Sequence, residues 1–131
     1  MKILITGCRG QLGTELQKQL AAGESELGRL PEAVQQAEVV AVDMDVLDIS
    51  DLAATKAFVG REKPDVIINC AAYTNVDGCE INRQDAFKAN ALGPRNLAMA
   101  AEAVGAKLVH VSTDYVFSGA DNGGVPLDEA D

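Results

Sequence analysis

The sequence predicts an α/β fold with a doubly wound parallel sheet of about four strands. Three observations lead to this prediction: short apolar, β-branched runs alternate with segments of helical period, a glycine-rich turn joins the first run to the first helical segment, and the composition suits a packed domain. With 131 residues, 47% of them hydrophobic, the chain can bury one core and is too short for two domains. We therefore expect one domain over residues 1–131.

The first thirteen residues carry the strongest local signal. Residues 2–6 are an apolar, β-branched run, Gly7, Gly10 and Gly13 follow, and leucines then recur every four residues from position 12. This order predicts a buried strand, a tight turn and a helix whose first N–H groups bind a phosphate. The glycine spacing is one residue longer than in G-x-G-x-x-G, and a plain turn before a surface helix would also use glycine. We favour dinucleotide binding because strand, turn and helix occur in the required order.

The second strand is predicted at residues 38–42, after a surface connection over residues 21–34 with a helical turn near Glu32. This strand ends at Asp43. An acidic residue in that place accepts hydrogen bonds from an adenosine ribose, usually about twenty residues after the glycine turn. The surface connection accounts for the longer distance in this chain. The alternative is a solvated loop aspartate without a ligand.

A helix is predicted over residues 51–60, with Ser50 as its N-cap. Its apolar side chains, expected to be buried, are Leu52, Phe58 and Val59. Pro64 breaks the chain after this helix. Residues 65–72 then form a continuous apolar run ending in small residues, which is typical of a parallel strand covered on both faces.

A long helical period over residues 83–104 is interrupted by Gly93 and Pro94. Its core-facing side chains are predicted to be Phe87, Ala91, Leu97, Ala101 and Val104. Because Pro94 has no N–H, the carbonyl of Asn90 loses its helical partner. Two interpretations stay open: the kink only improves packing, or it presents Asn90 to water in the site.

The fourth strand is predicted at residues 107–111, and it delivers the polar residues 112–115 to the edge where the dinucleotide is expected, shared by the first and fourth strands. We interpret His110 as a core or edge histidine, because it precedes the strand end. The strand's apolar side chains, Leu108, Val109 and Val111, would lie on an uncovered sheet edge. Such an edge favours a homodimer or aggregation. Residues 118–131 are predicted to be a loop.

Charge, hydrophobic pattern and cysteine content limit the kinds of partner, location and metal site that we expect. The net charge of −9 at pH 7 argues against nucleic acid and against an anionic membrane surface, so a small molecule is the expected partner. No signal-peptide core and no run of eighteen apolar residues is present, which predicts a soluble cytoplasmic protein. Three cysteines without C-x-x-C spacing and one histidine predict neither a disulfide framework nor a metal site.

Four segments together resemble the extended short-chain dehydrogenase/reductase family. They are residues 5–13 (ITGCRGQLG), 64–77 (PDVIINCAAYTNVD), 90–93 (NALG) and 112–117 (STDYVF). The last segment is the most specific and is similar to the branch that reduces sugar nucleotides. The resemblance covers the whole chain and implies a Rossmann-like fold, NADPH or NADH as cofactor, and reduction of the 4-keto group of a dTDP-6-deoxy sugar, a step in dTDP-rhamnose biosynthesis.

The resemblance also implies roles for particular residues. The cofactor-binding residues it implies, together with the glycine turn and strand ends described above, are Gly7, Gly10, Gln11, Leu12, Gly13, Asp43, Asp48, Ile49, Ala71, Ala72, Tyr73, Thr74 and Asn90. Among them, residues 10–12 would contact the pyrophosphate, Asp43 the adenine-side ribose, residues 48–49 the adenine, and residues 72–74 the nicotinamide half. Thr113 and Asp114 would contact the sugar substrate, and Thr113 would hydrogen-bond the carbonyl being reduced as the catalytic residue.

One departure from the family pattern decides what the chain alone is expected to do. The family donates its proton from a tyrosine with a lysine four residues later, whereas Tyr73 is followed at that spacing by Asp77 and Tyr115 by Gly119. In the family this pair comes shortly after a segment that resembles residues 126–131. We therefore expect a truncated reductase, the NAD(P)-binding part of an enzyme without its substrate domain, which is inactive alone.

Other functions stay open at this point. One is a regulatory module that binds a dinucleotide without catalysis, and another is a sugar-nucleotide epimerase or dehydratase of the same extended family. Between cofactors, Asp43 repels the 2′-phosphate of NADPH while Arg9 in the glycine turn offsets that repulsion. We expect both cofactors to bind, NADH somewhat better.

Overall fold

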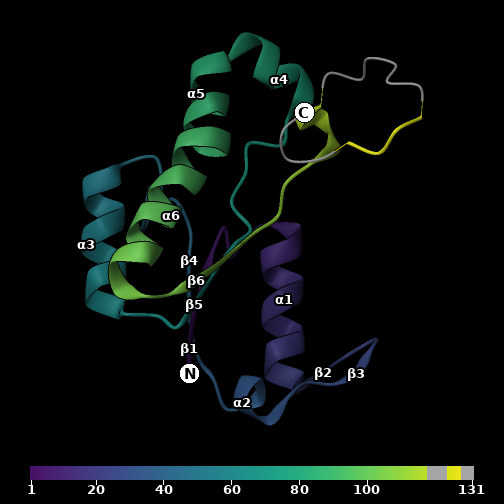
Figure 1. Cartoon of the computed structure of the whole chain (residues 1–131), viewed down its shortest axis with the longest axis vertical. Helices are drawn as coiled ribbons and strands as arrows, with labels where there is room; N and C mark the ends of the chain where they lie inside the picture. Colours follow the sequence, from purple (N-terminus) through teal and green to yellow (C-terminus); the bar gives the residue numbers. More distant parts are fainter. Residues whose placement is uncertain (118–123, 128–131) are drawn as a thin grey trace.

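The computed structural model describes residues 1–117 and 124–127 and contains a four-stranded parallel sheet (Figure 1). The strands are β1 (Lys2–Thr6), β4 (Glu38–Val42), β5 (Val66–Asn69) and β6 (Lys107–His110). Their order is β4-β1-β5-β6 and every neighbouring pair is parallel. The predicted α/β fold is confirmed. The expected edge shared by the first and fourth strands is wrong, because β5 lies between β1 and β6.

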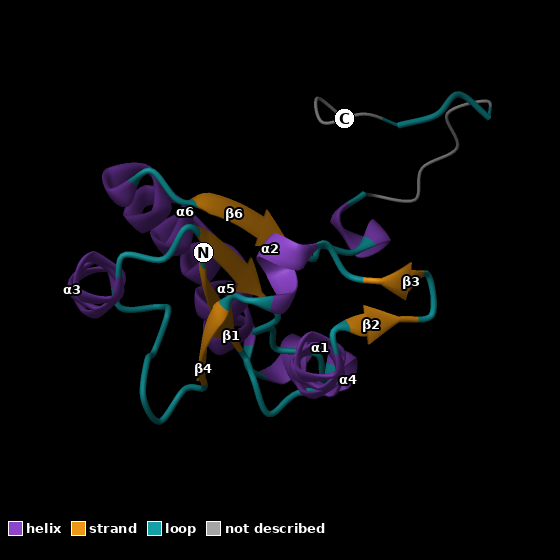
Figure 2. Cartoon of the chain, turned by 90° about the horizontal axis from the view of Figure 1, so that it is seen from below, coloured by secondary structure: helices purple, strands orange, loops and turns teal. Residues whose placement is uncertain are grey.

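Helices cover both faces of the sheet, with α1 on one side and α3 and α6 on the other (Figures 1 and 2). The helices are α1 (Gln11–Ala22), α2 (Glu32–Gln35), α3 (Leu52–Glu62), α4 (Val76–Ile81), α5 (Arg83–Phe87), the π-helix η1 (Lys88–Leu92), α6 (Gly93–Val104) and the 3₁₀ turn η2 (Asp114–Val116). The predicted surface connection contains α2, near the expected Glu32, and a small hairpin of β2 (Glu24–Ser25) and β3 (Gly28–Arg29) that was not predicted.

The core lies between the sheet and the helix pair α3 and α6. Leu4 of β1, Ile67 of β5, Val59 of α3 and Leu97 of α6 are all fully buried there. The face under α1 is less well covered, since Leu12 is 47% exposed and the other two leucines of that helix are only half-buried. The fold is therefore held mainly by the layer on the α3 and α6 side of the sheet.

Several predicted boundaries differ from the structure: α3 ends at Glu62 rather than near residue 60, β6 ends at His110 rather than residue 111, and two further differences have a clear cause. Asp51, not Ser50, caps α3, because the Asp51 carboxylate accepts the N–H of Ala54 at 2.9 Å, while the Ser50 carbonyl accepts the side chain of Asn96 at 2.9 Å. The third strand ends at Asn69 instead of residue 72. The N–H of Ala71 turns inward to the Asn69 side chain, at 3.1 Å, which takes the backbone out of the ladder.

The helical run over residues 83–104 is continuous in space but changes its period. The π-helix η1 lies between α5 and α6, and Pro94 stands in the first turn of α6. The wider turn rotates the preceding residues, so Phe87 is 59% exposed and Ala91 is exposed, whereas Leu97 and Ala101 are buried as predicted. Part of the predicted core face was therefore wrong.

Candidate functional site

A groove of about 540 Å³ lies over the carboxyl ends of the strands β4, β1 and β5. This is where ligands bind in open parallel sheets. Its lining residues are Thr6, Gly7, Gly10, Asp43, Met44, Leu47, Asp48, Ile49, Ser50, Cys70, Ala71, Ala72, Tyr73, Asp85, Lys88 and Ala89. The groove therefore runs from the glycine turn and the acidic strand end to a wall formed by α5 and η1.

The floor of the groove requires glycine at two positions. Gly7 has φ +68, and a Cβ there would lie 2.6 Å from the backbone N and Cα of Ala71. A Cβ at Gly13 would collide with the carbonyl oxygen of Gly7. The turn and the strand end thus pack backbone against backbone. Gly10 caps α1 without a side-chain hydrogen bond, so the helix start presents its N–H groups to an anion.

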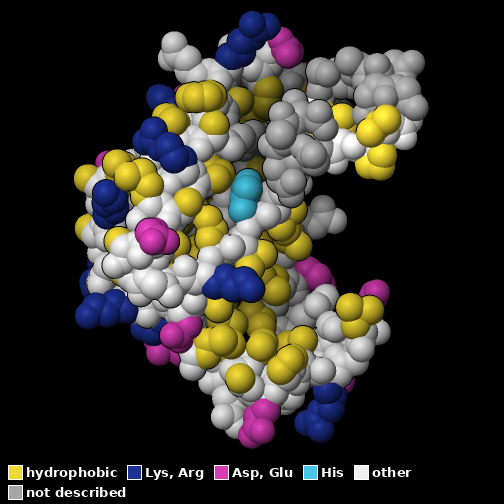
Figure 3. All heavy atoms as spheres, viewed as in Figure 1, with side chains coloured by type: hydrophobic (Ala, Val, Ile, Leu, Met, Phe, Trp, Pro, Cys, Tyr) yellow, Lys and Arg dark blue, Asp and Glu magenta, His cyan; other side chains and the backbone are white. Residues whose placement is uncertain are grey.

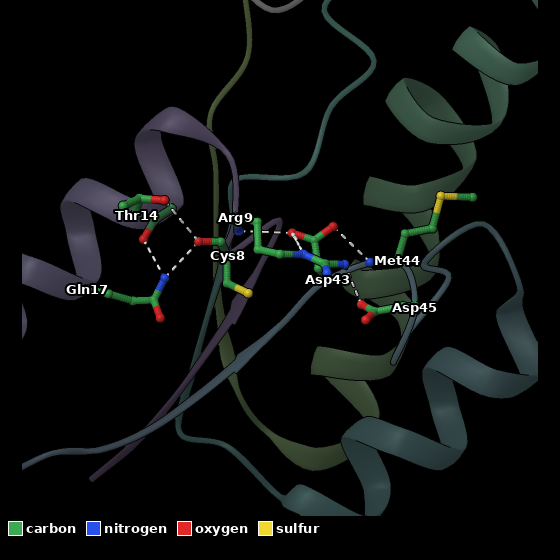
Figure 4. Close-up of polar contacts among 8 residues, drawn as sticks. Cys8, Arg9, Thr14, Gln17, Asp43, Met44 and Asp45 are labelled. Carbon is green, nitrogen blue, oxygen red and sulfur yellow. Dashed lines mark hydrogen bonds and ion pairs between the residues drawn. The ribbon is translucent and has the colours of Figure 1, made fainter.

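The glycine turn is braced by the first turns of α1. The amide nitrogen of Gln17 donates to the carbonyl of Cys8 at 2.8 Å and to that of Gly13 at 2.9 Å, and the Thr14 hydroxyl donates to the Cys8 carbonyl at 3.4 Å (Figure 4). These bonds connect the turn to the helix that follows it. The N–H groups at the start of α1 are thereby held in place before any ligand arrives.

Asp43 stands at the end of β4 and faces the glycine turn (Figure 4). One carboxylate oxygen accepts the main-chain N–H of Arg9 and the other that of Met44, both at 2.9 Å. These two hydrogen bonds, the one from Arg9 above all, hold the pKa of Asp43 below its ordinary value, and the Arg9 guanidinium adds to the effect. The carboxylate is therefore charged and fixed in position, as an acceptor of ribose hydroxyls must be.

The Arg9 side chain lies between two carboxylates. Its Nη2 is 2.5 Å from Asp45 Oδ1, and its Nε is 3.7 Å from Asp43 Oδ2. Arg9 and Asp45 are mostly exposed, whereas the side chain of Asp43 is 23% exposed. The flank of the groove next to Asp43 therefore holds one cation and two anions.

The opposite wall is held by Asn90 in the π-helix. Its Oδ1 accepts the N–H of Tyr73 at 2.7 Å, and its Nδ2 donates to the carbonyl of Tyr73 at 3.0 Å. Asn90 thus holds the loop after β5 by binding both the N–H and the carbonyl of Tyr73. Two interpretations of Asn90 were left open, a kink that only improves packing and a kink that presents Asn90 to water in the site. In the structure the Asn90 side chain binds the main chain of Tyr73 and lies beside the groove rather than lining it.

Three polar side chains form a row across β1, β5 and β6. Thr6, Asn69 and His110 are register partners, with Thr6 and Asn69 almost completely buried. The Thr6 hydroxyl donates to Asn69 Oδ1 at 2.6 Å, and Asn69 Nδ2 lies 3.0 Å from His110 Nδ1. His110 itself is exposed at the surface, where its side chain is drawn in cyan (Figure 3). It is an edge histidine, as predicted, and it anchors the buried row.

Thr113 and Asp114 follow β6 and do not line the groove. Both are exposed, and the Thr113 hydroxyl lies 3.2 Å from Asp114 Oδ1. Cys70 does line the groove, and burial raises the pKa of its thiol, which keeps it protonated and unreactive near neutral pH. Part of the tail predicted as a loop, residues 118–123 and 128–131, lies outside the described residues.

The family model of the RmlD substrate binding domain matches residues 1–131. The chain belongs to this family. It spans little more than a third of the length of the curated relatives it matches. The resemblance seen in the four sequence segments is confirmed, since relatives over nearly the whole chain are named dTDP-4-dehydrorhamnose reductase.

Three relatives show how similar this RmlD-family chain is to known reductases. A dTDP-4-dehydrorhamnose reductase of Mycobacterium tuberculosis (strain CDC 1551 / Oshkosh) is 46% identical over 125 residues, 95% of this chain and 36% of that protein. A crystal structure of such a reductase from Clostridium acetobutylicum ATCC 824 is 47% identical with a TM-score of 0.81, over 100% of this chain and 42% of that one. The structure of a dTDP-4-dehydrorhamnose reductase from Bacillus anthracis str. Ames, in complex with NADP, is 40% identical with a TM-score of 0.77. The match covers 92% of this chain and 39% of that one.

Eight of the sequence-predicted cofactor residues line the groove of this RmlD-family chain. They are Gly7, Gly10, Asp43, Asp48, Ile49, Ala71, Ala72 and Tyr73. Gln11 and Leu12 begin α1 beside it, Gly13 packs under Gly7, and Thr74 follows Tyr73 in the loop. Sequence reasoning missed Asp85 and Lys88, whose place in the groove wall depends on how α5 and η1 fold, and Leu47, which lies in the loop after β4.

Within residues 1–117 and 124–127, no group of three or more His, Cys, Asp or Glu side chains is arranged to hold a metal ion. In the same described part of the chain, no helix is long and apolar enough to cross a bilayer.

Proposed function

We propose that this chain is the cofactor-binding part of an NAD(P)H-dependent reductase that reduces the 4-keto group of a dTDP-6-deoxy sugar. The observation that carries the proposal is the groove itself, in which the glycine turn, the fixed carboxylate of Asp43 and the strand ends meet. The relatives named dTDP-4-dehydrorhamnose reductase, one of them solved with NADP, support both the substrate class and the cofactor. An enzyme that uses this cofactor works where it is regenerated, so we place it in the cytoplasm.

The residues fit a dinucleotide by their chemistry. The helix start at Gly10, Gln11 and Leu12 would hold the pyrophosphate, Asp43 the ribose, and Asp48 with Ile49 the adenine. Ala71, Ala72, Tyr73 and Thr74 would follow the nicotinamide half, with Asn90 fixing their loop. When bound, the dinucleotide supplies the hydride, and Thr113 with Asp114 would orient the sugar carbonyl.

Titration calorimetry with NADH and NADPH tests cofactor binding on a sample whose folding is checked by circular dichroism. We expect saturable binding of both. Gly13→Ala, which has no room for its Cβ, is the negative control. A folded wild-type sample that gives no heat at millimolar cofactor contradicts the proposal.

A homodimer through β6 belongs to the same proposal. Val109 of the edge strand β6 is 42% exposed and Val111, directly after it, is 52% exposed, whereas Leu108 packs against the core and was wrongly expected to be uncovered. Unpaired strand edges beside apolar side chains invite pairing with another chain. Light scattering is the measurement, and a monodisperse monomer across the concentration range contradicts the dimer.

A regulatory module without catalysis and an extended-family epimerase or dehydratase are the alternative functions. The full reading frame of the gene separates the first from a reductase, because a reductase needs a Tyr-x-x-x-Lys pair, which residues 1–131 do not contain, and a module without catalysis does not. The segment at residues 112–117 favours the reductase over the epimerase.

A further inference from the structure

We infer that Asp45 sets the cofactor preference of the groove by holding Arg9 away from the 2′-phosphate of NADPH. The inference rests on the proposed function, because it concerns the same dinucleotide site. It assigns Asp45 a role in specificity and no part in the chemistry of reduction.

Arg9 lies beside the proposed ribose site. Its main-chain N–H is bound to Asp43 at 2.9 Å, so the backbone of Arg9 lies against the carboxylate proposed to bind the ribose. The 2′-position of that ribose would therefore lie next to Arg9. Of the two cofactors, only NADPH carries a phosphate there, with a charge of about −1.5 to −2 at neutral pH for a phosphate monoester. A free guanidinium in this place would bind that phosphate through two hydrogen bonds.

The Arg9 guanidinium is already paired with a carboxylate. Figure 4 shows the Arg9 side chain running between Asp43 and Asp45, and its Nη2 is 2.5 Å from Asp45 Oδ1. One positive and two negative charges leave this cluster with one net negative charge. A 2′-phosphate would meet repulsion unless Arg9 left Asp45. The ribose of NADH, with hydroxyls only, meets no such repulsion.

Asp43 and Asp45 are held in different ways. Asp43 is fixed by two main-chain N–H groups and lies 3.7 Å from Arg9 Nε, so its position does not depend on the Arg9 side chain. Asp45 is 62% exposed and meets the end of the guanidinium. Removing the charge of Asp45 therefore weakens its hold on the Arg9 guanidinium and leaves the ribose acceptor in place.

The experiment compares dissociation constants for NADPH and NADH by calorimetry at one low ionic strength, because salt screens these charges. Asp45→Asn is expected to tighten NADPH binding about two- to fivefold, the size of an exposed charge interaction, and to change NADH binding less than about twofold. Glu102→Gln removes the same charge from an exposed site on α6 and is the matched control. It should leave the ratio of the two constants unchanged.

Arg9→Gln supplies the second test. If Asp45 acts by holding Arg9, Asp45→Asn in the Arg9→Gln background should lose most of its effect on NADPH. An equal effect in both backgrounds would mean direct repulsion by Asp45 and overturns the inference, as does an unchanged ratio in Asp45→Asn alone. Failure of the folded wild type to bind either cofactor would instead refute the proposed function.

Discussion

Asn90→Ala removes the clamp on Tyr73 and tests how the groove wall is held. The substitution deletes the acceptor of the Tyr73 N–H, at 2.7 Å, and the donor to the Tyr73 carbonyl, at 3.0 Å. A hydrogen bond contributes about 0.5–1.5 kcal/mol net. Because Asn90 is exposed, we place the loss for the pair at about 1–2 kcal/mol of the free energy of unfolding. Tyr73 lines the groove, so cofactor affinity should fall as well.

Urea unfolding and a cofactor titration measure the two effects on the same samples. Asn82→Ala is the matched control, since Asn82 bonds the Tyr73 hydroxyl at 3.3 Å rather than its main chain and should change affinity little. Asn90→Asp keeps an acceptor but faces the Tyr73 carbonyl without a donor, so it should not rescue binding. If Asn90→Ala kept both the unfolding free energy and the cofactor affinity of the wild type, the clamp would have no role.

Gly13→Ala should lower stability by about 1–3 kcal/mol through overpacking against the Gly7 carbonyl, seen as a lower Tm; an unchanged Tm contradicts the packing. Asp43 has a pKa below its ordinary value of 3.8, so its stabilising contribution is full above that pH and lost as the pH falls through the lower folded pKa. Asp43→Asn should therefore flatten the acid limb of unfolding curves, and an unaltered limb refutes this. The chain alone should not oxidise NADPH with a dTDP-4-keto-6-deoxy sugar, because general acid catalysis worth roughly 10²–10⁴-fold is missing; turnover within about tenfold of a full-length relative would disprove it.

The parts of the fold that could be predicted depend on local sequence. The glycine turn and the strand ends are set by residues that follow one another, and the requirement for glycine at position 7 arises from a positive φ and a close backbone contact. Asp43 was predictable for the same reason, as the acidic residue directly after a strand. Such signals depend on residue type and spacing alone.

The groove wall could not be predicted in the same way. The period of residues 83–104 indicates a helix, but a π-turn shifts the phase by a fraction of a turn, and this exposes Phe87. The helix α4 was missed because its six residues are too few to show a period. Lys88 enters the groove only through this shifted wall, so its place has no signature in sequence.

Thr6, Asn69 and His110 lie far apart in the sequence, and no sequence motif predicts that their side chains form a hydrogen-bonded row. The N–H of Ala71 can only donate, so the Asn69 side-chain atom that it contacts is the oxygen Oδ1. The Asn69 atom that faces His110 is therefore the NH₂ group. His110 Nδ1 then accepts, and the proton of the neutral ring lies on Nε2. One buried amide thus connects β1, which carries the glycine turn, to β6, which leads to Thr113. The cofactor edge and the proposed substrate edge are joined by the same side chain, so a change at Asn69 should disturb both.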